Sequence, residues 1–390
     1  MGEKLTLDVR QQSSLRQALL AEERRLPITL IVTLGGGSMD MYSRYLAEHL
    51  DVNKVYTNIY QRSAELFNVS LISKASIWSL LEDVSFAKAL EQAEGILHLP
   101  NHHMGRYGLF IKKPFIITVH DLIRFFDMRG GDVLIHRPNL RDRVYLHMDY
   151  AGVRKAVKII AVSNTTKKDL MNYLKLPSEK IAVVYEGVDH DTFKPVKRRL
   201  IDEPYILYVG SEHPRKNLTR ILAAFKKVKQ DPRFKDLKLV KVGEAGGREA
   251  DFRSMTLKAI ERLKLKDDVI FVGKVAKEDL PAYYSHAECF VMPSLYEGFG
   301  LPLLEAMACG CPVITSNISA PPEVTADAAL HVNPRCVEDI ASAIISVLSN
   351  DELRCELKIK GLKRAKEFSW EKTAKETFKV YKEVVEQLGF

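Results

Sequence analysis

Two acids placed eight positions apart, Glu297 and Glu305, are the residues of this sequence best suited to hold a polar ligand. The first lies in a predicted loop with Gly298 and Gly300, directly after a buried strand, and Pro302 fits the first turn of the next helix. The free N–H groups of such a helix start attract an anion. Acids near an anion are useful when they accept hydrogen bonds, and sugar or ribose hydroxyls are suitable donors. The alternative, a helix-capping acid and an unrelated surface acid, leaves the glycines and the proline unexplained.

A pair of cations, Arg215 and Lys216, forms a second candidate site. The pair follows a predicted strand and Gly210, and Asn217 is expected to cap the next helix. Ligands of doubly wound sheets bind at the carboxyl ends of the strands, and two cations beside a helix N-terminus can hold a diphosphate. On an ordinary surface the same pair would be a solvated charge run, so its place after the strand is what indicates function.

The N-terminal half offers weaker candidates. A buried strand over 115–119 ends in His120 and Asp121, and a histidine at a strand end is usually a structural residue. Gly36 and Gly37 lie in a loop between the first strand and the first helix, with Ser38 expected as the helix cap. This loop lacks the GxGxxG spacing, so it does not predict a nicotinamide site.

These residues need an α/β framework to bring them together. β-branched runs alternate with helical patterns along almost the whole chain, which is typical of parallel βαβ units. A charged segment between two prolines divides the alternation into two series. We therefore expect α/β domains over 1–195 and 205–368, a linker over 196–204 and a last helix over 369–390. The strands are expected at 28–34, 54–60, 95–99, 115–119, 159–162 and 181–184, and at 205–209, 237–242, 269–272, 289–292, 312–315 and 329–332.

Composition excludes several classes of protein. The 390 residues carry a formal charge of +8 and are 46% hydrophobic, which indicates folded domains and excludes a disordered or low-complexity chain. The first 25 residues are too charged for a secretory signal, and no apolar run approaches the length of a membrane span. The five cysteines lack zinc-site spacing and are expected to be reduced and mostly buried. A cytoplasmic location is the expectation.

Several motifs together resemble one known family. The segment 293–314 is similar to the EX7E signature of retaining glycosyltransferases of family 4, which have the GT-B architecture of two Rossmann-like domains facing a cleft. Segments 159–170 and 184–189 resemble the family's AVSxxTxxDL junction and its NGVD turn, although Glu186 stands where Asn is frequent. Segment 208–218, which includes Gly210, resembles the stretch that leads to the phosphate-binding helix.

The resemblance implies an activity and a division of labour. A hexosyl group of the glucose or mannose type would pass from a UDP- or GDP-hexose, held by the C-terminal domain, to a hydroxyl acceptor held by the N-terminal domain. The last helix would cross back onto the N-terminal domain. The family's active-site histidine corresponds to His120, with Asp121 beside it, and the loop of Gly36 and Gly37 would face the cleft.

The resemblance also implies roles for the residues of the C-terminal half. Arg215 and Lys216 would neutralise the leaving diphosphate, Glu297 would hold sugar hydroxyls and Glu305 would hold the ribose diol. The backbone N–H groups of the loop would assist at the phosphate or the sugar; they belong to Phe299, Gly300 and Leu301.

A metal site and other cofactors are not expected. Asp189, His190 and Asp191 form a DxD triplet, which holds a metal in the other major glycosyltransferase architecture, but here it lies in the turn before the linker. We therefore expect transfer without an essential divalent cation, with the nucleotide sugar as the co-substrate.

Two questions stay open at this point. The basic segment 124–158 fits a solvated helix face, or contact with an anionic acceptor or membrane lipid at the inner membrane face. The acceptor could be lipid-linked or a polysaccharide, and nucleic acid is not expected because aromatics are scarce among these charges. Two rival functions are a sugar-nucleotide 2-epimerase and a non-catalytic binder of carbohydrate or anionic polymer.

Overall fold

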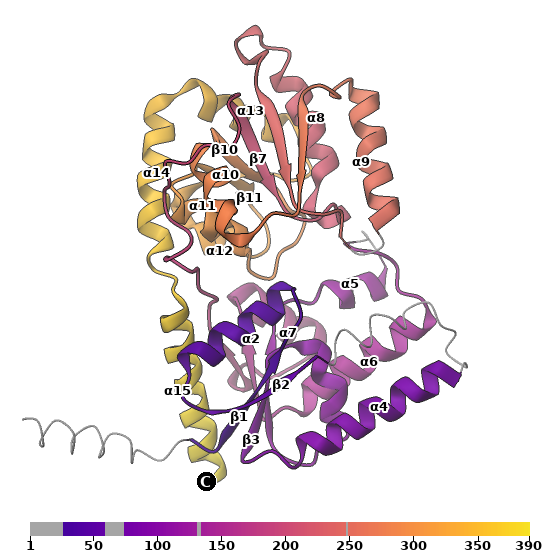
Figure 1. Ribbon diagram of the computed structural model, residues 1–390. Coiled ribbons are helices and arrows are strands. Elements are labelled where there is room, and N and C mark those ends of the chain that lie inside the picture. Colours follow the sequence, from indigo (N-terminus) through magenta and orange to yellow (C-terminus); the bar gives the residue numbers. More distant parts are fainter. Residues whose placement is uncertain (1–25, 59–73, 131–133, 247–248) are drawn as a thin grey trace, which may run out of the picture.

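The computed structural model describes residues 26–58, 74–130, 134–246 and 249–390, which form two α/β lobes stacked one above the other (Figure 1). Each lobe is built on a six-stranded sheet in which every paired strand is parallel. The first sheet has the order β2 (Asn53–Thr57), β1 (Ile28–Thr33), β3 (Ile96–Leu99), β4 (Phe115–Val119), β5 (Lys158–Ala161) and β6 (Ile181–Val183). The second has the order β12 (Ala329–Val332), β11 (Val313–Ser316), β10 (Cys289–Met292), β7 (Tyr205–Val209), β8 (Lys238–Val242) and β9 (Val269–Gly273).

The strand orders determine where a ligand can bind. Strand order reverses between β1 and β3 in the first sheet, and between β7 and β10 in the second. At such a switch point the connections leave in opposite directions, which opens a crevice beyond the carboxyl ends of the strands. The chain after β7 and the chain after β10 therefore meet at one crevice of the second lobe.

Helices follow most of the strands, as the alternation of patterns predicted. In the first lobe they are α2 (Ser38–His49), α4 (Lys74–Leu90), α5 (Ile123–Arg129), α6 (Leu140–Lys155) and α7 (Asn164–Leu174). In the second lobe they are α8 (Leu218–Val228), α9 (Glu249–Leu263), α10 (Leu280–His286), α11 (Leu301–Ala308), α12 (Pro321–Thr325), α13 (Val337–Ser349) and α14 (Asp351–Ala365). The parallel doubly wound fold class expected from the sequence is confirmed.

The last helix, α15 (Trp370–Leu388), returns to the first lobe (Figure 1). Ser369 caps it, since its hydroxyl accepts a hydrogen bond from the N–H of Lys372. The apolar face of the helix buries Trp370 and Tyr381 in one cluster with Ile28 and other residues of the first sheet. The expected crossing back to the N-terminal lobe is therefore present.

Most predicted strands agree with the structure to within one or two residues. The largest difference is the strand expected at 54–60, which ends at Thr57, and residues 59–60 lie outside the described part of the chain. The N-terminal residues 1–25 also lie outside it. Ser38 is not the cap of α2, because Gly37 occupies that position and donates its N–H to the carboxylate of Asp40.

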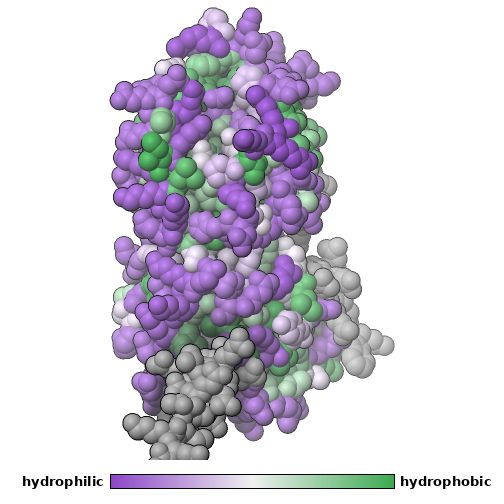
Figure 2. All heavy atoms as spheres, turned by 60° about the vertical axis from the view of Figure 1, so that its left-hand side comes forward, coloured by the Kyte–Doolittle hydropathy of each residue, from purple (hydrophilic) through white to green (hydrophobic). Residues whose placement is uncertain are grey.

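The surface of the molecule is mainly polar on the face that Figure 2 displays, where hydrophobic side chains form only small separate areas. None of the helices in the described part of the chain has the length and apolar character needed to cross a membrane. Three of the five cysteines are buried, as expected, but Cys355 is exposed and Cys336 is half-buried.

Candidate functional site

The crevice of the second lobe contains the cations and the first acid singled out in the sequence. Gly210 and the short helix η3 (Pro214–Lys216) follow β7, while the loop with Glu297 follows the neighbouring strand β10. The two loops contact each other directly, since the N–H of Leu295 donates to the carbonyl of Arg215 at 2.7 Å. The strand order alone therefore brings together residues about 80 positions apart.

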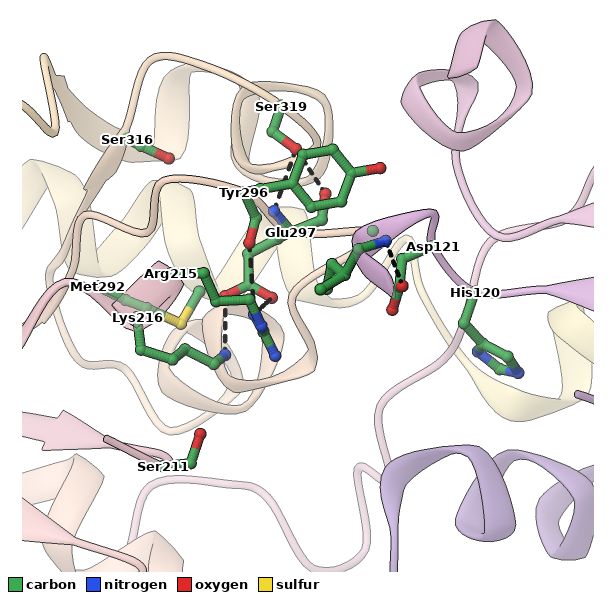
Figure 3. A network of polar contacts seen from close by, with 12 residues as sticks. His120, Asp121, Ser211, Arg215, Lys216, Met292, Tyr296, Glu297, Ser316 and Ser319 are labelled. Atoms are coloured by element: carbon green, nitrogen blue, oxygen red, sulfur yellow. Dashed lines mark hydrogen bonds and ion pairs between the residues drawn. The ribbon is translucent and has the colours of Figure 1, made fainter. Parts of the chain in front are cut away.

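Arg215 and Lys216 both bind the carboxylate of Glu297. The distances are 2.8 Å from Arg215 Nη1 to Oε2 and 2.7 Å from Lys216 Nζ to Oε1. Figure 3 shows both cations directed at this one carboxylate. The side chains are only 15%, 9% and 7% exposed for Arg215, Lys216 and Glu297, so the cluster is largely shielded from water. The Nε of Arg215 is also buried and has no hydrogen-bond partner among the described residues, which leaves a donor for a ligand.

The pKa values reflect this arrangement. Burial alone would raise the pKa of Glu297, but the charges of Arg215 and Lys216 outweigh it and lower the pKa to about 2. Burial lowers the pKa of Lys216 against the opposing pull of Glu297. The ion pairs place two basic side chains against one carboxylate, and the resulting excess of positive charge suits an anionic ligand.

The backbone of Glu297 is fixed by a residue that the sequence analysis did not identify. The hydroxyl of Ser319 accepts from the N–H of Glu297 at 3.1 Å and donates to its carbonyl at 2.6 Å. Ser319 has a left-handed backbone, with φ of 64°, which is unusual for a residue with a side chain. The two bonds resist rotation of the loop about Glu297.

Asn217 also stabilises the site, but not as the cap that was expected. It occupies the position before α8 with φ of 65°, and its side chain makes no capping bond. Its amide instead donates to the carbonyls of Pro293 and Pro334, at 2.9 and 2.6 Å. Asn217 thus ties η3 to the segment that leads to Glu297.

The glycines of this region allow close approach. A Cβ at Gly298 would lie 1.9 Å from the carbonyl oxygen of His120, which belongs to the other lobe. Gly300 has φ of 112° at the start of α11, and Gly210 has φ of 145° beside the aliphatic chain of Lys216. A side chain at Gly298 would push the two lobes apart, so glycine is required there.

The AVSxxT segment of the N-terminal lobe contacts the same loop. Ser163 caps α7 through the N–H of Thr166 and donates its own hydroxyl proton to the carbonyl of Gly298 at 2.6 Å. Thr166 Oγ1 lies 3.3 Å from the same carbonyl. The motif therefore connects the N-terminal lobe to the loop that carries Glu297.

Glu305 lies one turn into α11, separate from the cluster of Glu297. Its carboxylate accepts a hydrogen bond from the hydroxyl of Tyr284 at 2.9 Å. Burial raises its pKa to about 7, although the Tyr284 bond and the charges of Lys277 and Lys216 oppose the shift. A buried carboxylate with a pKa near neutrality is sensitive to what binds beside it.

The remaining residues expected in this region lie in and around the same loop. Phe299 is 4% exposed and packs in the core of the second lobe, so its backbone rather than its ring is available to a ligand. Leu301 begins α11 and contacts the hydrophobic clusters of both lobes.

On the N-terminal side, both ring nitrogens of His120 are engaged by the protein. Nδ1 lies 2.8 Å from Glu186 Oε1, and Nε2 lies 3.0 Å from the carbonyl oxygen of Pro100. The ring is turned away from Glu297 (Figure 3). Both contacts of the ring are with residues of its own lobe. The contact between His120 and the substrate stays a prediction.

Asp121 and the glycine loop lie at the carboxyl edge of the first sheet. The carboxylate of Asp121 accepts from the N–H of Ile123 at 2.9 Å and interacts electrostatically with Arg215 across the interface. Gly36 and Gly37 are exposed after β1, and Gly36 has no atom near enough to hinder a Cβ.

Asp189 and His190 of the DxD triplet make polar contacts with other segments of the protein. Asp189 Oδ2 lies 2.5 Å from Lys277 Nζ, and His190 Nε2 lies 3.0 Å from the carbonyl of Phe368. Lys277 belongs to the second lobe and also contacts the hydroxyl of Tyr45, on α2. Within the described ranges no group of three or more suitable side chains could hold a metal ion.

Much of the basic segment is paired within its own lobe. Arg124 lies 2.7 Å from Asp127 and donates to the carbonyl of His136 at 2.8 Å. Arg129 lies over the ring of Phe125, and Arg141 is buried. Arg137, Arg143 and Arg154 are exposed and remain available to a partner.

Comparison with known proteins gives a consistent result. A family model described as "Glycosyl transferases group 1" matches residues 189–364, and one described as "Glycosyltransferase Family 4" matches residues 44–192. The chain is 33% identical to the O-antigen chain mannosyltransferase B of Escherichia coli, over 62% of this chain and 65% of the relative. It is 34% identical to the O-antigen chain mannosyltransferase RfbU of Salmonella typhimurium, over 59% and 60%. The matched part thus spans slightly less than two thirds of these relatives.

Solved structures share the fold. The sucrose-phosphate synthase of Thermosynechococcus elongatus superposes with a TM-score of 0.73 at 24% identity, covering 93% of this chain and all of that one. Anabaena HepE superposes with a TM-score of 0.71 at 15% identity, covering 90% and 99%. The two family models together span both lobes and meet in the segment before β7. The chain therefore belongs to glycosyltransferase family 4 and has the GT-B fold.

Proposed function

We propose that the chain is a retaining hexosyltransferase that moves a mannosyl or glucosyl group from a nucleoside-diphosphate sugar to a hydroxyl of an acceptor. The observation that carries the proposal is the meeting of two largely shielded cations at one buried carboxylate, at the switch point of the second lobe. The names of the mannosyltransferase relatives favour mannose. HepE, which shares the fold, has been solved with UDP-glucose, in keeping with a nucleotide sugar as donor.

The cluster supplies the electrostatics that transfer needs. When the bond between sugar and diphosphate breaks, negative charge develops on the departing phosphate oxygen. Arg215 and Lys216 would stabilise this charge through charge-assisted hydrogen bonds. Because Glu297 already aligns both cations, little reorganisation is required when the diphosphate arrives. In this scheme the diphosphate shares the cations with Glu297, whose oxygens become available to the hydroxyls of the sugar.

Glu305 would hold the other end of the donor. A carboxylate accepts two hydrogen bonds from the adjacent hydroxyls of a ribose, and Tyr284 orients that carboxylate at 2.9 Å. The N–H groups at the start of α11 lie between the two acids along the chain. They are suited to phosphate oxygens, since the positive end of the helix dipole points out there.

Retention is what the family resemblance implies, and among the described residues no carboxylate is evidently placed as a nucleophile for a covalent intermediate. Glu297 is held by two cations with a pKa of about 2, which makes its carboxylate a poor nucleophile. We infer displacement on one face of the sugar, with the departing phosphate oxygen helping to take the proton of the acceptor hydroxyl. The cations would take over the charge-neutralising role of a metal, so transfer should proceed in excess chelator.

The acceptor would bind against the N-terminal lobe. The relatives named as O-antigen chain mannosyltransferases favour a saccharide acceptor, either lipid-linked or part of a polysaccharide. The exposed arginines Arg137, Arg143 and Arg154 are available for a phosphate on such an acceptor or for an anionic membrane surface.

A panel of nucleotide sugars tests the proposal. Each sugar nucleotide is screened by thermal shift with chelator present, and the one that stabilises most is then assayed with saccharide acceptors, with the product anomer determined by NMR. We expect a UDP- or GDP-hexose to be consumed and the anomeric configuration to be kept. Conversion of the nucleotide sugar to its 2-epimer without acceptor would favour the isomerase, and binding without any turnover would favour a carbohydrate binder.

A further inference from the structure

His120 and Glu186 form a buried ion pair that has no part in the proposed transfer chemistry. Both side chains are buried, with 7% and 6% of their surfaces exposed. His120 directly follows β4 and Glu186 follows β6, so the pair links two loops at the same edge of the first sheet. The sequence gives no direct sign of the contact, because the residues are 66 positions apart.

The two hydrogen bonds of the ring determine where its protons are. The carbonyl oxygen of Pro100 can only accept, so Nε2 of His120, at 3.0 Å, must carry a proton. Nδ1 lies 2.8 Å from Glu186 Oε1 and carries a second proton when that carboxylate is ionised, because an ionised carboxylate only accepts. With both nitrogens protonated the ring is a cation.

The groups around His120 support the charge. From its own strand end, Asp121 adds a second negative charge, while Glu186 contributes the largest favourable interactions. His102, at the start of the short helix η1 (His102–Leu109), and His98, on β3, also face it. Burial lowers the pKa of both, so neither competes as a cation. From α2, the ring of Tyr42 meets it edge-on at 4.8 Å between centroids, and burial keeps that tyrosine neutral.

The balance of burial and charge agrees with the hydrogen bonds. Burial alone would lower the pKa of His120, but the bond and charge of Glu186 outweigh it and raise the pKa above its usual value. The backbone of the same residue lies at the interface of the lobes, where its carbonyl accepts from Thr166 Oγ1 and contacts Gly298. The charged pair therefore holds the strand end against the loop of Glu297.

We propose that Glu186 is a positioning residue that keeps His120 doubly protonated and its ring fixed. His120 then contributes a permanent positive charge and a fixed backbone contact, and does not exchange protons with the substrate. Asparagine, which is frequent in the family at this place, could donate to a neutral ring and would leave its protonation free. The catalytic consequence rests on the proposed function, whereas the protonation state does not.

The protonation state can be measured directly by NMR on the full chain labelled with ¹⁵N and ¹³C in histidine, with the His120 signal assigned by its loss in His120→Gln. We expect both ring nitrogens of His120 to remain protonated from pH 5 to pH 8, while His98 stays neutral as an internal reference. In Glu186→Gln, whose amide can donate to Nδ1, the apparent pKa should fall by at least about one unit. Glu91, whose carboxylate accepts from the N–H of Lys112, supplies the control, since Glu91→Gln should leave His120 unchanged. A neutral His120 in the wild-type chain at pH 7, or an unchanged pKa in Glu186→Gln, would overturn the proposal.

The pH dependence of kcat gives a second readout that a merely structural role would not move. At saturating donor and acceptor the wild-type profile should show no limb from His120, and Glu186→Gln should introduce one that disappears in the double variant with His120→Gln. If Glu186→Gln does not fold, Glu186→Asn serves instead, and the wild-type NMR result stands without any variant. If no nucleotide sugar is turned over but His120 is an imidazolium, the proposed function fails and the positioning role survives. If a nucleotide sugar is turned over but His120 is neutral, the proposed function survives and the positioning role fails.

Discussion

The two walls of the interface between the lobes use their polar groups in opposite ways. On the C-terminal wall, Arg215 and Lys216 share one carboxylate and keep a net positive charge and an unused donor. On the N-terminal wall, the ring nitrogens of His120 are occupied by Glu186 and Pro100, and the carboxylate of Asp121 accepts from the N–H of Ile123. The first wall is ready to receive an anion, whereas the second is arranged to hold its own shape.

This difference indicates where specificity resides. A preformed charged cluster favours any diphosphate, so the common part of the donor can be recognised without adjustment of the protein. A wall whose polar groups are satisfied internally selects an acceptor mainly through shape and through its exposed loops. We therefore expect substitutions in the C-terminal wall to reduce catalysis strongly, and substitutions in the N-terminal wall to act through positioning.

Lys216→Ala should give the largest effect. A charge-assisted hydrogen bond to phosphate contributes about 1.5 to 3 kcal/mol, so kcat/KM should fall by ~10-fold to ~150-fold. Steady-state kinetics with varied donor measures the change. Arg233→Ala is the matched control, since this arginine is exposed in the same lobe, where it pairs with Asp231 and lies over the ring of Phe234. Equal kinetics for Lys216→Ala and the control would remove the cluster from the donor site.

Substitutions of the two acids of the C-terminal wall should affect different kinetic parameters. Glu297→Gln should lower kcat by ~10-fold or more, because contacts to the reacting sugar strengthen in the transition state. Glu305→Gln should chiefly raise the donor KM, because a ribose is held almost equally in the ground state and the transition state. The loss of donor-binding free energy should be at most about 3 kcal/mol. Initial rates at saturating acceptor resolve kcat from KM. The opposite pattern would exchange the two roles.

Donor binding should depend on pH through Glu305. Its pKa of about 7 in the free protein means that the carboxylate is mostly protonated at pH 6, where it loses an acceptor for the ribose. The dissociation constant should therefore be about tenfold higher at pH 6 than at pH 8. Calorimetric titration across this range provides the measurement. Glu305→Gln should flatten the dependence, and a wild-type curve that is already flat would place the ribose elsewhere.

The smallest effect is expected at the contact between the walls. Ser163→Ala removes a helix cap and the bond to Gly298, whereas Ser369→Ala removes a cap and a contact with Glu371 on its own helix. Each cap is worth about 1 kcal/mol, so both variants should unfold at slightly lower temperature. Only Ser163→Ala should also lower kcat, by about twofold to tenfold, the range of one neutral hydrogen bond. An equal loss of kcat in both variants would contradict a specific role for this contact.

The framework and the C-terminal wall could be predicted from the sequence because their signals are local. The β-branched runs mark the strands, and Arg215, Lys216 and Glu297 each stand next to a strand end. The positions of these residues in a doubly wound sheet follow from general rules of topology. The DxD triplet likewise suggested a turn, and the structure pairs Asp189 with Lys277.

The partners within the site could not be predicted, because they depend on contacts between distant segments. Ser319, Tyr284 and the bond from Ser163 to Gly298 have no local signal that distinguishes them from ordinary polar residues. Glu186 was visible only as a departure from the family pattern, and its role required the position of His120. Asn217 was expected as a helix cap from its residue type, but carbonyls from two other segments compete successfully for its amide.

The most direct test of the charged cluster is the binding of a nucleoside diphosphate alone, measured by calorimetry in excess chelator. UDP and GDP are each titrated into the wild-type chain and into the double variant Arg215→Ala with Lys216→Ala. We expect one of them to bind the wild-type chain without metal, and the double variant to bind it at least ~10-fold more weakly while remaining folded. Unchanged affinity in the double variant, or wild-type binding that appears only when magnesium or manganese is added, would contradict the account.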